Sequence, residues 1–234
     1  MRHGVVIVLL GGPGAGKGTQ GERLSSFLGI PTISTGDMLR QECRSGSALG
    51  AQVKSLLETG QLVKDDLISE VVAQRLAKPD CTHGCILDGF PRTAPQARFL
   101  DALLEKLDFE PPVVIDLAIA PEELVARLSS RRQCPTCNRT FQGASGLSSC
   151  PQDGTELVYR ADDQPATIRR RLQIYTSNAS EIVRYYQDSG SYNRVNASGL
   201  VEEVGQKVLA VLSTVSNGTQ DFKPPVLVSQ HLYA

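Results

Sequence analysis

The chain has 234 residues, which is enough to bury a sizeable core in one large domain or in a core carrying small insertions. Its 24 Lys and Arg against 25 Asp and Glu give a net charge of -1, which excludes a global basic field that would attract nucleic acid or an anionic membrane. No segment approaches the roughly 18 consecutive apolar residues of a membrane span. We therefore expect a soluble, cytoplasmic protein whose anion chemistry is local.

The first apolar run, Val5–Leu10, predicts a buried parallel strand. This run is short and leads into a glycine-rich loop rather than into a small-residue cleavage site, so we interpret it as a strand and not as a signal peptide. Residues 18–28 predict the helix that follows the loop. A strand, a glycine loop and a helix N-terminus together form an anion site.

The loop itself reads GGPGAGKGT from Gly11 to Thr19 and almost fits the phosphate-loop pattern G-x-x-x-x-G-K-[ST]. Gly18 stands where a hydroxyl normally follows the lysine, and the hydroxyl arrives one residue later on Thr19. Backbone N–H groups of such a loop surround phosphates while its lysine reaches their oxygens. The alternative, a flexible glycine turn, requires neither the lysine nor the preceding apolar strand. The predicted phosphate-binding residues are Gly14, Ala15, Gly16, Lys17, Gly18 and Thr19.

The next elements alternate between helices and strands. The pattern predicts a short strand within 29–34, helices from Met38 and over 48–58, a helix opened by Asp65 and Asp66, a strand over 85–88, a helix over 99–107 and a strand over 112–117. The third of these helices carries a core-facing stripe of Leu67, Val71, Val72 and Leu76. Such alternation implies βαβ units and a parallel sheet, with the ligand beyond the carboxyl ends of the strands. The glycine loop and Asp88 both lie at such ends.

The pattern changes over residues 131–160, which contain turn residues, cysteines and few apolar positions. This stretch is too poor in apolar residues to form a core without a staple, so we interpret it as an insertion. The core is completed by a long helix over 162–187, a strand over 192–196 and a helix bearing Val201, Val204, Val208 and Leu212. The tail, residues 216–234, has no place in this scheme and is expected to be mobile.

Three of the six cysteines cluster with an aspartate in the pattern C-x₂-C-x₁₂-C-x₂-D. Three thiolates and one carboxylate fill a closed tetrahedral zinc site, which is structural because no position is left for a substrate. The predicted ligands are Cys134, Cys137, Cys150 and Asp153. The alternative is three free thiols and a surface aspartate. Cys81 and Cys85 are interpreted as core or loop residues, and Cys43 has no partner in the sequence pattern.

Arginine-bearing segments are the third feature: Asp88-Gly-Phe-Pro-Arg92, Arg131-Arg132, Arg160 with two aspartates, and residues 169–171. Phosphoryl transfer requires a set of this kind, because the enzyme mainly positions the reactants and stabilises charge on the transferred group. Planar guanidinium groups suit that task. For any single arginine, a solvated helix charge is the alternative. Asp88, at a strand end, is a candidate to orient Mg²⁺ directly or through water.

With these motifs in place, the chain from about residue 5 to about residue 212 resembles the adenylate kinases, in the long-lid, zinc-binding form of that family. The matching blocks are GGPGAGKGTQ (11–20), ISTGDMLR (33–40), GQLV (60–63), LDGFPRT (87–93), RADD (160–163) and TIRRRL (167–172). Gly18 after the lysine belongs to this family's own form of the loop. The resemblance implies a P-loop NTPase fold of the α/β class, with a five-stranded parallel sheet flanked by helices.

The resemblance also implies a division into parts. Residues 1–33, 64–125 and 164–215 would form the core, residues 34–63 a small helical segment that binds the nucleoside monophosphate, and residues 126–163 a zinc-stapled lid over ATP. The implied function is reversible, Mg²⁺-dependent transfer of the terminal phosphoryl group of ATP to AMP, giving two ADP, by a monomer that binds neither nucleic acid nor membrane. The alternatives are another nucleoside monophosphate kinase, such as one for UMP/CMP or one using GTP, and a nucleic-acid-binding zinc ribbon with a regulatory P-loop.

The same resemblance implies the site residues. The catalytic set is Lys17, Asp88, Arg92, Arg131, Arg160 and Arg171. Besides the phosphate loop, ATP would be bound by Arg127, Arg131, Thr140, Phe141 and Gly199. AMP would be bound by Thr35, Arg40, Gln61, Leu62, Val63, Gly89, Phe90, Pro91, Arg92, Gln96, Arg160 and Arg171, with Gln96 and the backbone of residues 61–63 reading adenine. Two residues depart from the family pattern: Gly199 replaces a common lysine or glutamine, and Phe141 replaces a common tyrosine.

Overall fold

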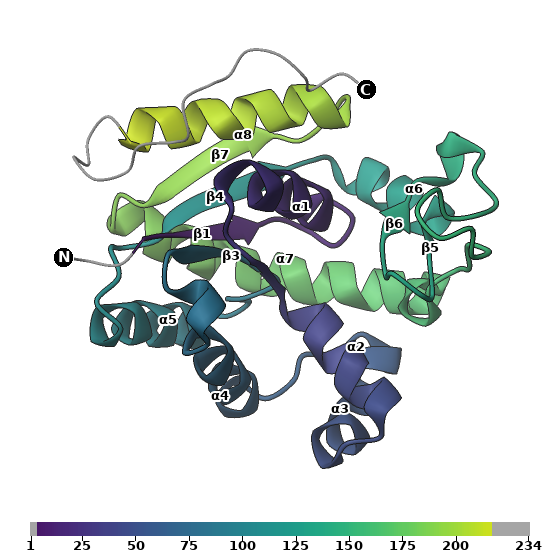
Figure 1. Ribbon diagram of the computed structural model, residues 1–234, viewed down its shortest axis with the longest axis horizontal. Coiled ribbons are helices and arrows are strands. Elements are labelled where there is room, and N and C mark those ends of the chain that lie inside the picture. The colour runs from purple at the N-terminus through teal and green to yellow at the C-terminus, as the bar shows by residue number, and fades with distance from the viewer. Residues whose placement is uncertain (1–3, 217–234) are drawn as a thin grey trace.

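A five-stranded parallel sheet forms the centre of the computed structural model, which describes residues 4–216 (Figure 1). The strand order is β2-β3-β1-β4-β7, and every neighbouring pair is parallel. The strands are β1 (Val5–Leu10), β2 (Thr32–Ser34), β3 (Gly84–Asp88), β4 (Val113–Ala118) and β7 (Tyr192–Asn196). The predicted fold class and sheet are confirmed.

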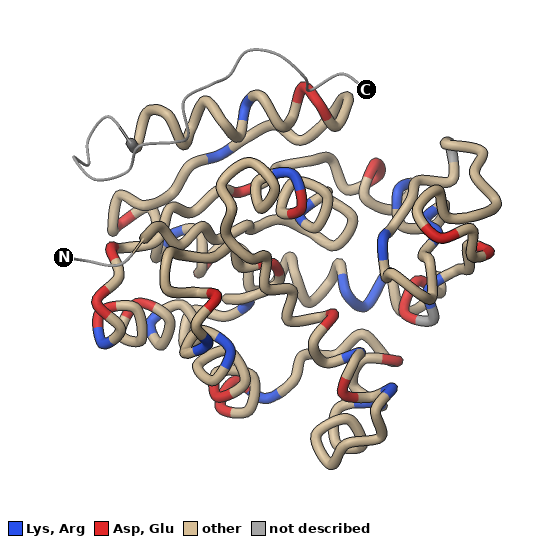
Figure 2. Tube along the Cα trace, viewed as in Figure 1, with Lys and Arg blue, Asp and Glu red and all other residues tan. Residues whose placement is uncertain are grey.

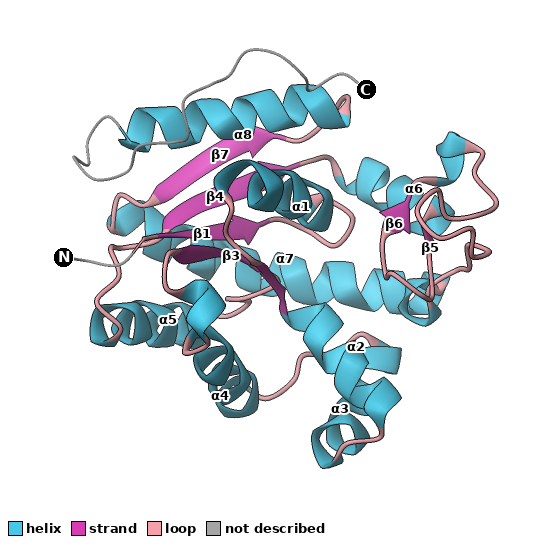
Figure 3. Ribbon diagram, in the orientation of Figure 1, coloured by secondary structure: helices cyan, strands magenta, loops and turns pink. Residues whose placement is uncertain are grey.

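Helices cover both faces of this sheet, in the layered arrangement that Figure 3 shows by colour. Val6 and Val8 of β1 point into a core shared with α4, α5 and α7, whereas Ile7 and Leu9 point into a core shared with α1 and α8. Because both faces are buried, the strand is a continuous apolar run rather than an alternating one. These helices are α1 (Lys17–Leu28), α4 (Asp65–Leu76), α5 (Ala94–Lys106), α7 (Pro165–Asp188) and α8 (Val201–Ser216).

Some details of the predicted helices differ. The helix α2 (Thr35–Ser45) begins three residues before the predicted Met38, because Ser34 caps it by accepting a hydrogen bond from the Asp37 N–H at 3.3 Å. In α4, Val72 and Leu76 are buried as predicted and Leu67 and Val71 are half-buried, but Ile68, absent from the predicted stripe, is also buried. In α8, Val201 is 39% exposed because it stands at the helix start.

Two insertions project from the core at the end of the sheet where β1 and β3 finish (Figure 1). The first consists of α2 and α3 (Ala48–Thr59), between β2 and α4. The second follows α6 (Pro121–Ser130) and contains the short strands β5 (Arg132–Gln133) and β6 (Thr140–Phe141). The predicted boundaries at 34–63 and 126–163 stay predictions. The predicted lid begins within α6, which runs unbroken to Ser130.

Three short 3-10 helices complete the secondary structure of the described residues: η1 (Pro79–Cys81), η2 (Gly143–Ser145) and η3 (Ala161–Asp163). Over residues 4–216, no helix combines the length and apolarity needed to cross a bilayer. Figure 2 shows acidic and basic positions interspersed along the trace. Apart from Ser216, the last residue of α8, the predicted tail lies outside the described residues.

Candidate active site

The glycine loop turns from β1 into α1 and holds Lys17 at the first helical position. Gly16 caps the helix with φ 95°, a left-handed backbone conformation that glycine adopts without strain. The Lys17 ammonium donates hydrogen bonds to the carbonyl oxygens of Gly11 at 2.8 Å and Gly12 at 2.9 Å. The loop therefore holds its lysine against its own backbone, beside the N–H groups at the start of α1.

The whole predicted catalytic set lines one cavity at the carboxyl ends of β1 and β3. Its members there are Lys17, Asp88, Arg92, Arg131, Arg160 and Arg171, and the loop residues Gly14, Gly16, Gly18 and Thr19 line the same space. Ala15 is instead buried in the core beneath the loop. The chain thus brings together cations from the glycine loop, the end of β3, the two ends of the insertion after α6, and α7.

A second cavity adjoins the first under α2 and α3. Of the residues predicted to bind AMP, it is lined by Thr35, Arg40, Gln61, Leu62, Val63, Gly89, Arg92, Gln96 and Arg171. The two cavities share Arg40, Arg92 and Arg171. Arg160 and Pro91 line only the first cavity, and Phe90 is buried in the core. Two binding spaces therefore meet at a common set of guanidinium groups.

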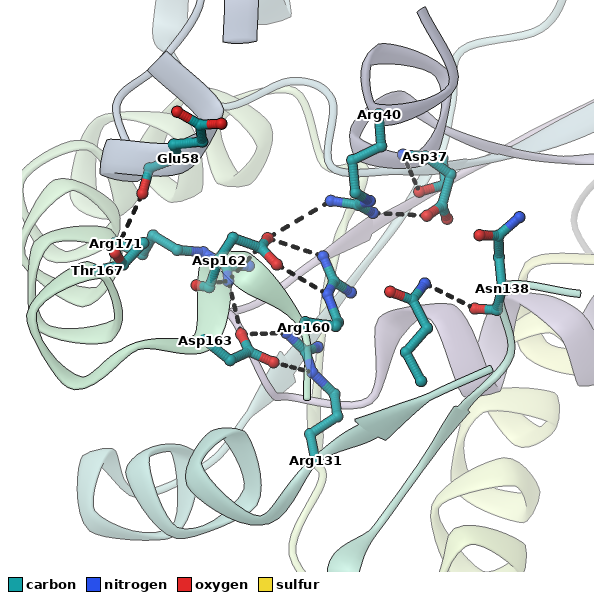
Figure 4. A network of polar contacts seen from close by, with 12 residues as sticks. Asp37, Arg40, Glu58, Arg131, Asn138, Arg160, Asp162, Asp163, Thr167 and Arg171 are labelled. Carbon is teal, nitrogen blue, oxygen red and sulfur yellow. Dashed lines mark hydrogen bonds and ion pairs between the residues drawn. The ribbon is translucent and has the colours of Figure 1, made fainter. Parts of the chain in front are cut away.

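Two neighbouring carboxylates hold four arginines of the site, Arg40, Arg131, Arg160 and Arg171, in place (Figure 4). Asp162 accepts two hydrogen bonds from Arg160, at 2.9 and 2.8 Å, and a third from Arg171 at 3.3 Å. Arg40 of α2 lies 3.6 Å from the same carboxylate. Asp163 accepts hydrogen bonds from both Nε and Nη2 of Arg131, at 2.7 and 2.6 Å. Cations that would otherwise repel one another are thereby fixed around the cavity.

Burial and ion pairing act in opposite directions on the charges of this network. Burial disfavours the charged Asp162 carboxylate, but Arg160 and Arg171 outweigh that effect and hold its pKa well below the ordinary range. Burial lowers the pKa of Arg171 to about 10, against the attraction of Asp162. Burial also lowers the pKa of Lys17 to about 8, against the attraction of Asp88. Lys17 and Arg171 line the first cavity and Asp162 holds its arginines, and shifted pKa values gathered around one cavity are typical of a functional site.

Arg92 differs from the other arginines of the site. Its Nε donates to the Gly89 carbonyl at 2.8 Å, and within residues 4–216 it forms no ion pair with a carboxylate. Gly89 has φ 85°, and a Cβ there would lie 2.9 Å from both the Arg92 guanidinium and the Thr35 hydroxyl. Only glycine fits this turn, which leaves the exposed Arg92 side chain directed into the shared space.

The four predicted metal ligands converge in the insertion that follows α6, the predicted lid. Their sulfur and oxygen atoms all lie within 4.8 Å of one another. The sulfurs of Cys137 and Cys150 are 3.6 Å apart, and the Cys134 sulfur lies 3.3 Å from an oxygen of Asp153. Ligands about 2.3 Å from a tetrahedral zinc would place two sulfurs about 3.8 Å apart. The residues present therefore fit such an ion.

The comparisons with known proteins identify the family. Residues 9–191 match the family model described as adenylate kinase. A protein named adenylate kinase from Anaeromyxobacter dehalogenans (strain 2CP-C) is 41% identical over 204 residues, covering 86% of this chain and 95% of the relative. One from Kosmotoga olearia is 42% identical over 214 residues, covering 89% and 99%, and one from Chlamydia caviae is 38% identical over 210 residues, covering 90% and 98%.

The chain belongs to the adenylate kinase family. Adenylate kinases are ATP:AMP phosphotransferases, which explains why two binding spaces meet at one cationic junction. The family match confirms the predicted activity and does not favour the alternatives, a UMP/CMP-type or GTP-using kinase and a nucleic-acid-binding zinc ribbon.

The residues predicted to bind the ATP base, unlike the predicted catalytic set, do not all line the first cavity. Arg127 lines the phosphate cavity and donates to Glu123 at 2.6 Å and to the Ala197 carbonyl at 3.0 Å, which joins α6 to the loop before α8. Gly199 lies in that loop but does not line either cavity. Thr140 lines the cavity, whereas the Phe141 ring packs against the cysteine cluster. The contacts of Phe141 and Gly199 with ATP stay predictions.

Several residues that organise this adenylate kinase site were absent from the predicted set. Asp162 and Asp163 lie within the RADD block, and Asp37 precedes Arg40 by one helical turn and accepts from it at 2.6 Å. Their closeness in the sequence to an arginine of the site is the signal that could have identified these acidic residues. Asp65 carried no such signal, because its partners Thr93 and Gln96 are 28 and 31 residues away.

Proposed function

We propose a position for each nucleotide and a role for each site residue in the phosphoryl transfer from ATP to AMP. The ATP phosphates would lie on the glycine loop in the first cavity, and AMP would lie in the second, beneath α2 and α3. The observation that carries this proposal is the pair of adjoining cavities with Arg92 and Arg171 in the walls of both. A phosphoryl group passing from donor to acceptor would then remain within reach of the same cations.

The catalytic contribution of these cations is electrostatic. Charge spreads over the equatorial oxygens of the transferred group, and prearranged donors stabilise it without reorganisation during the step. Lys17, Arg92, Arg131, Arg160 and Arg171 would supply these donors. Asp162 and Asp163 would keep the last three apart and oriented before the nucleotides arrive. Phosphate oxygens then compete with the two carboxylates for the guanidinium protons.

Adenylate kinases use Mg²⁺ with ATP, and the residues of the cavity fit the ion. The Asp88 carboxylate lies at the end of β3 and, over the described part of the chain, accepts no side-chain hydrogen bond. The Thr19 hydroxyl lines the same space. When bound, Mg²⁺ neutralises charge on the ATP phosphates. We assign Asp88 to orient the hydrated ion, a role for which oxygen donors are suited.

The two insertions would act as covers. We propose that residues 34–63 close over AMP and residues 126–163 over ATP, which excludes water and directs the phosphoryl group to AMP rather than to hydrolysis. The hydrogen bond from Arg44 of α2 to the Asn138 side chain of the lid, at 2.9 Å, joins the two insertions across the cavity. This contact supports the proposal that they can approach each other directly.

We further propose that the lid holds a structural zinc ion on Cys134, Cys137, Cys150 and Asp153. Three observations support it: the convergence of the four side chains, the burial of Cys134 and Cys150, and the very small apolar cluster around them. A lid with so little apolar surface requires a staple to keep a fixed shape. The ion would have no open position for a substrate and would act through the lid's stability alone.

A monomer in the cytoplasm is the proposed working form. Both cavities are lined by one chain, so no second copy is needed to complete the site. The near-balanced charge, -1 overall, supports the expectation that the enzyme binds neither nucleic acid nor membrane. Light scattering on the purified protein would test this: a mass near 25.2 kDa is expected, and a stable dimer would overturn the proposal.

The substrate assignment is tested by a coupled assay in which AMP, CMP, UMP and GMP are offered with either ATP or GTP. We expect the highest kcat/KM for the pair ATP and AMP. If no monophosphate accelerated ATP turnover, the kinase activity itself would be refuted. If CMP or UMP were preferred to AMP, the acceptor assignment would fail while the phosphotransfer remained.

A further inference from the structure

Asp65 is tied to the candidate AMP base site through two long-range contacts. It is the first residue of α4, and its carboxylate accepts a hydrogen bond from the Gln96 side-chain Nε2 at 2.6 Å. The Thr93 hydroxyl donates to the other oxygen of the same carboxylate at 2.8 Å. Thr93 in turn caps α5 by accepting from the Gln96 N–H at 3.3 Å. Asp65 thereby joins α4 to the start of α5.

The other end of the Gln96 amide is also fixed. Its Oε1 accepts a hydrogen bond from the Arg92 backbone N–H at 2.7 Å. An ionised carboxylate only accepts and a backbone N–H only donates, so these two partners permit a single orientation of the amide. Rotating the amide by half a turn would set its oxygen against the Asp65 carboxylate and its NH₂ against the Arg92 N–H. Two hydrogen bonds, one of them charge-assisted, would be replaced by two repulsive contacts.

This fixed orientation determines what the amide can still offer to a ligand. Gln96 is only 3% exposed and lines the second cavity, and its amide retains one N–H and one oxygen lone pair. Adenine presents a donor at its 6-amino group and an acceptor at N1. A 6-oxopurine presents the reverse, an acceptor at O6 and a donor at N1. An amide that could rotate would therefore satisfy either base, whereas a fixed amide matches one of them.

We propose that Asp65 is a specificity-positioning residue: its carboxylate prevents Gln96 from rotating and so excludes 6-oxopurine monophosphates from the AMP site. The inference rests on the proposed contact of Gln96 with the acceptor base. Asp65 acts through Gln96 and touches no reacting atom.

The variant Asp65→Asn tests this directly. An asparagine of nearly the same size can turn either its oxygen or its NH₂ toward Gln96, so the charge-assisted restraint is lost and only the Arg92 N–H still opposes the rotated amide. We expect the ratio of kcat/KM for AMP to that for inosine monophosphate to fall at least about tenfold, through KM, while the KM for ATP stays unchanged. Partial unfolding lowers both activities equally and leaves the ratio unchanged. If Asp65→Asn does not yield folded protein, Asp65→Ser offers the same choice of donor or acceptor.

Asp66→Asn is the matched control. It removes the same charge from the same helix start, but Asp66 is exposed and, over residues 4–216, lines neither cavity. In this control, the ratio of kcat/KM for AMP to that for inosine monophosphate should equal the wild-type ratio. The variant Gln96→Ala tests the contact of Gln96 with the base separately from the role of Asp65. If Gln96→Ala left the ratio unchanged, the proposed base contact would fail; if Gln96→Ala collapsed the ratio while Asp65→Asn preserved it, the role of Asp65 would be overturned.

Discussion

The carboxylate of Asp163 accepts two hydrogen bonds from the guanidinium of Arg131, at 2.7 and 2.6 Å, although the two residues are 32 positions apart in the chain. Its side chain is only 1% exposed, and it also accepts from Arg171 at 3.0 Å. One buried carboxylate thus connects the beginning of the lid, its end and the long helix α7. Of the arginines in the predicted catalytic set, Arg131 and Arg171 are positioned by this acidic side chain.

Replacing Asp163 by asparagine should therefore impair both stability and catalysis. Arg131 would lose both hydrogen bonds to a buried carboxylate, and Arg171 would keep only its pairing with Asp162. Breaking a buried ion pair costs on the order of 3 kcal/mol in the free energy of unfolding. We also expect kcat/KM for ATP to fall by about tenfold or more. Urea denaturation and steady-state kinetics measure the two effects. Asp188→Asn, on the exposed end of the same helix, is the control. Wild-type values for Asp163→Asn in both measurements would refute the role.

Arg92→Ala should lose most of the activity while the fold persists. Arg92 lies in the walls of both cavities and has no ion pair within the described residues, so its charge is available to the transferred group. Removing a catalytic arginine from a phosphoryl site costs about a thousandfold in kcat, or about 4 kcal/mol of transition-state stabilisation. Arg98→Ala, an exposed arginine on α5, should keep normal kinetics. Near-normal kcat in Arg92→Ala would remove this residue from the mechanism.

Binding of ATP should weaken as the pH rises through about 8, where Lys17 loses its proton in the free enzyme. The pKa of this lysine is lowered, so its charge is fully present only below that pH, and the bound phosphates attract only the charged form. The Kd of a non-hydrolysable ATP analogue, measured from about pH 7 to about pH 10, tests this. In Lys17→Arg the side chain remains charged throughout. An inflection common to both proteins would show that another group is responsible.

The lid should depend on its metal. Protein purified without added metal is expected to contain one zinc per chain, and Cys137→Ser should lose it together with part of the activity, because the lid loses its staple. Elemental analysis gives the metal content, and Cys43→Ser is the control thiol. Cys43 lies in α2 and donates to the Gly50 carbonyl at 3.4 Å, a contact that serine can also make. Substoichiometric zinc in both the wild type and Cys137→Ser would discard the site.

Much of the site followed from short stretches of sequence. The apolar run before the glycine loop, the lysine at its end and the spacing of the three cysteines each report on residues close together in the chain. Local patterns of this kind translate directly into a strand, a helix start or a metal-binding loop. The family resemblance then supplied the individual roles, and residues predicted from it, such as Lys17 and Arg92, do converge on one cavity.

The runs of consecutive arginines show a limit of prediction from local sequence patterns. Residues in a helix are rotated about 100° from one to the next, so of residues 169–171 only Arg171 reaches the cavity, while Arg169 and Arg170 are exposed. Arg131 likewise lines the cavity, whereas Arg132 contacts Tyr159 in the lid. Charge alone does not distinguish the members of a run, because the face that a helix or loop turns inward depends on packing.

The sequence by itself determined the nucleotide chemistry of this protein: a phosphate loop with Gly18 in place of a hydroxyl, a parallel sheet and a four-ligand cluster in an insertion. The tertiary structure alone decided how the charges are paired and how the Gln96 amide is oriented. Asp163 meets Arg131, and Asp65 meets Gln96, only because separate segments pack side by side around the sheet. Such contacts join residues about thirty positions apart, a separation that backbone propensities and side-chain periodicity do not encode.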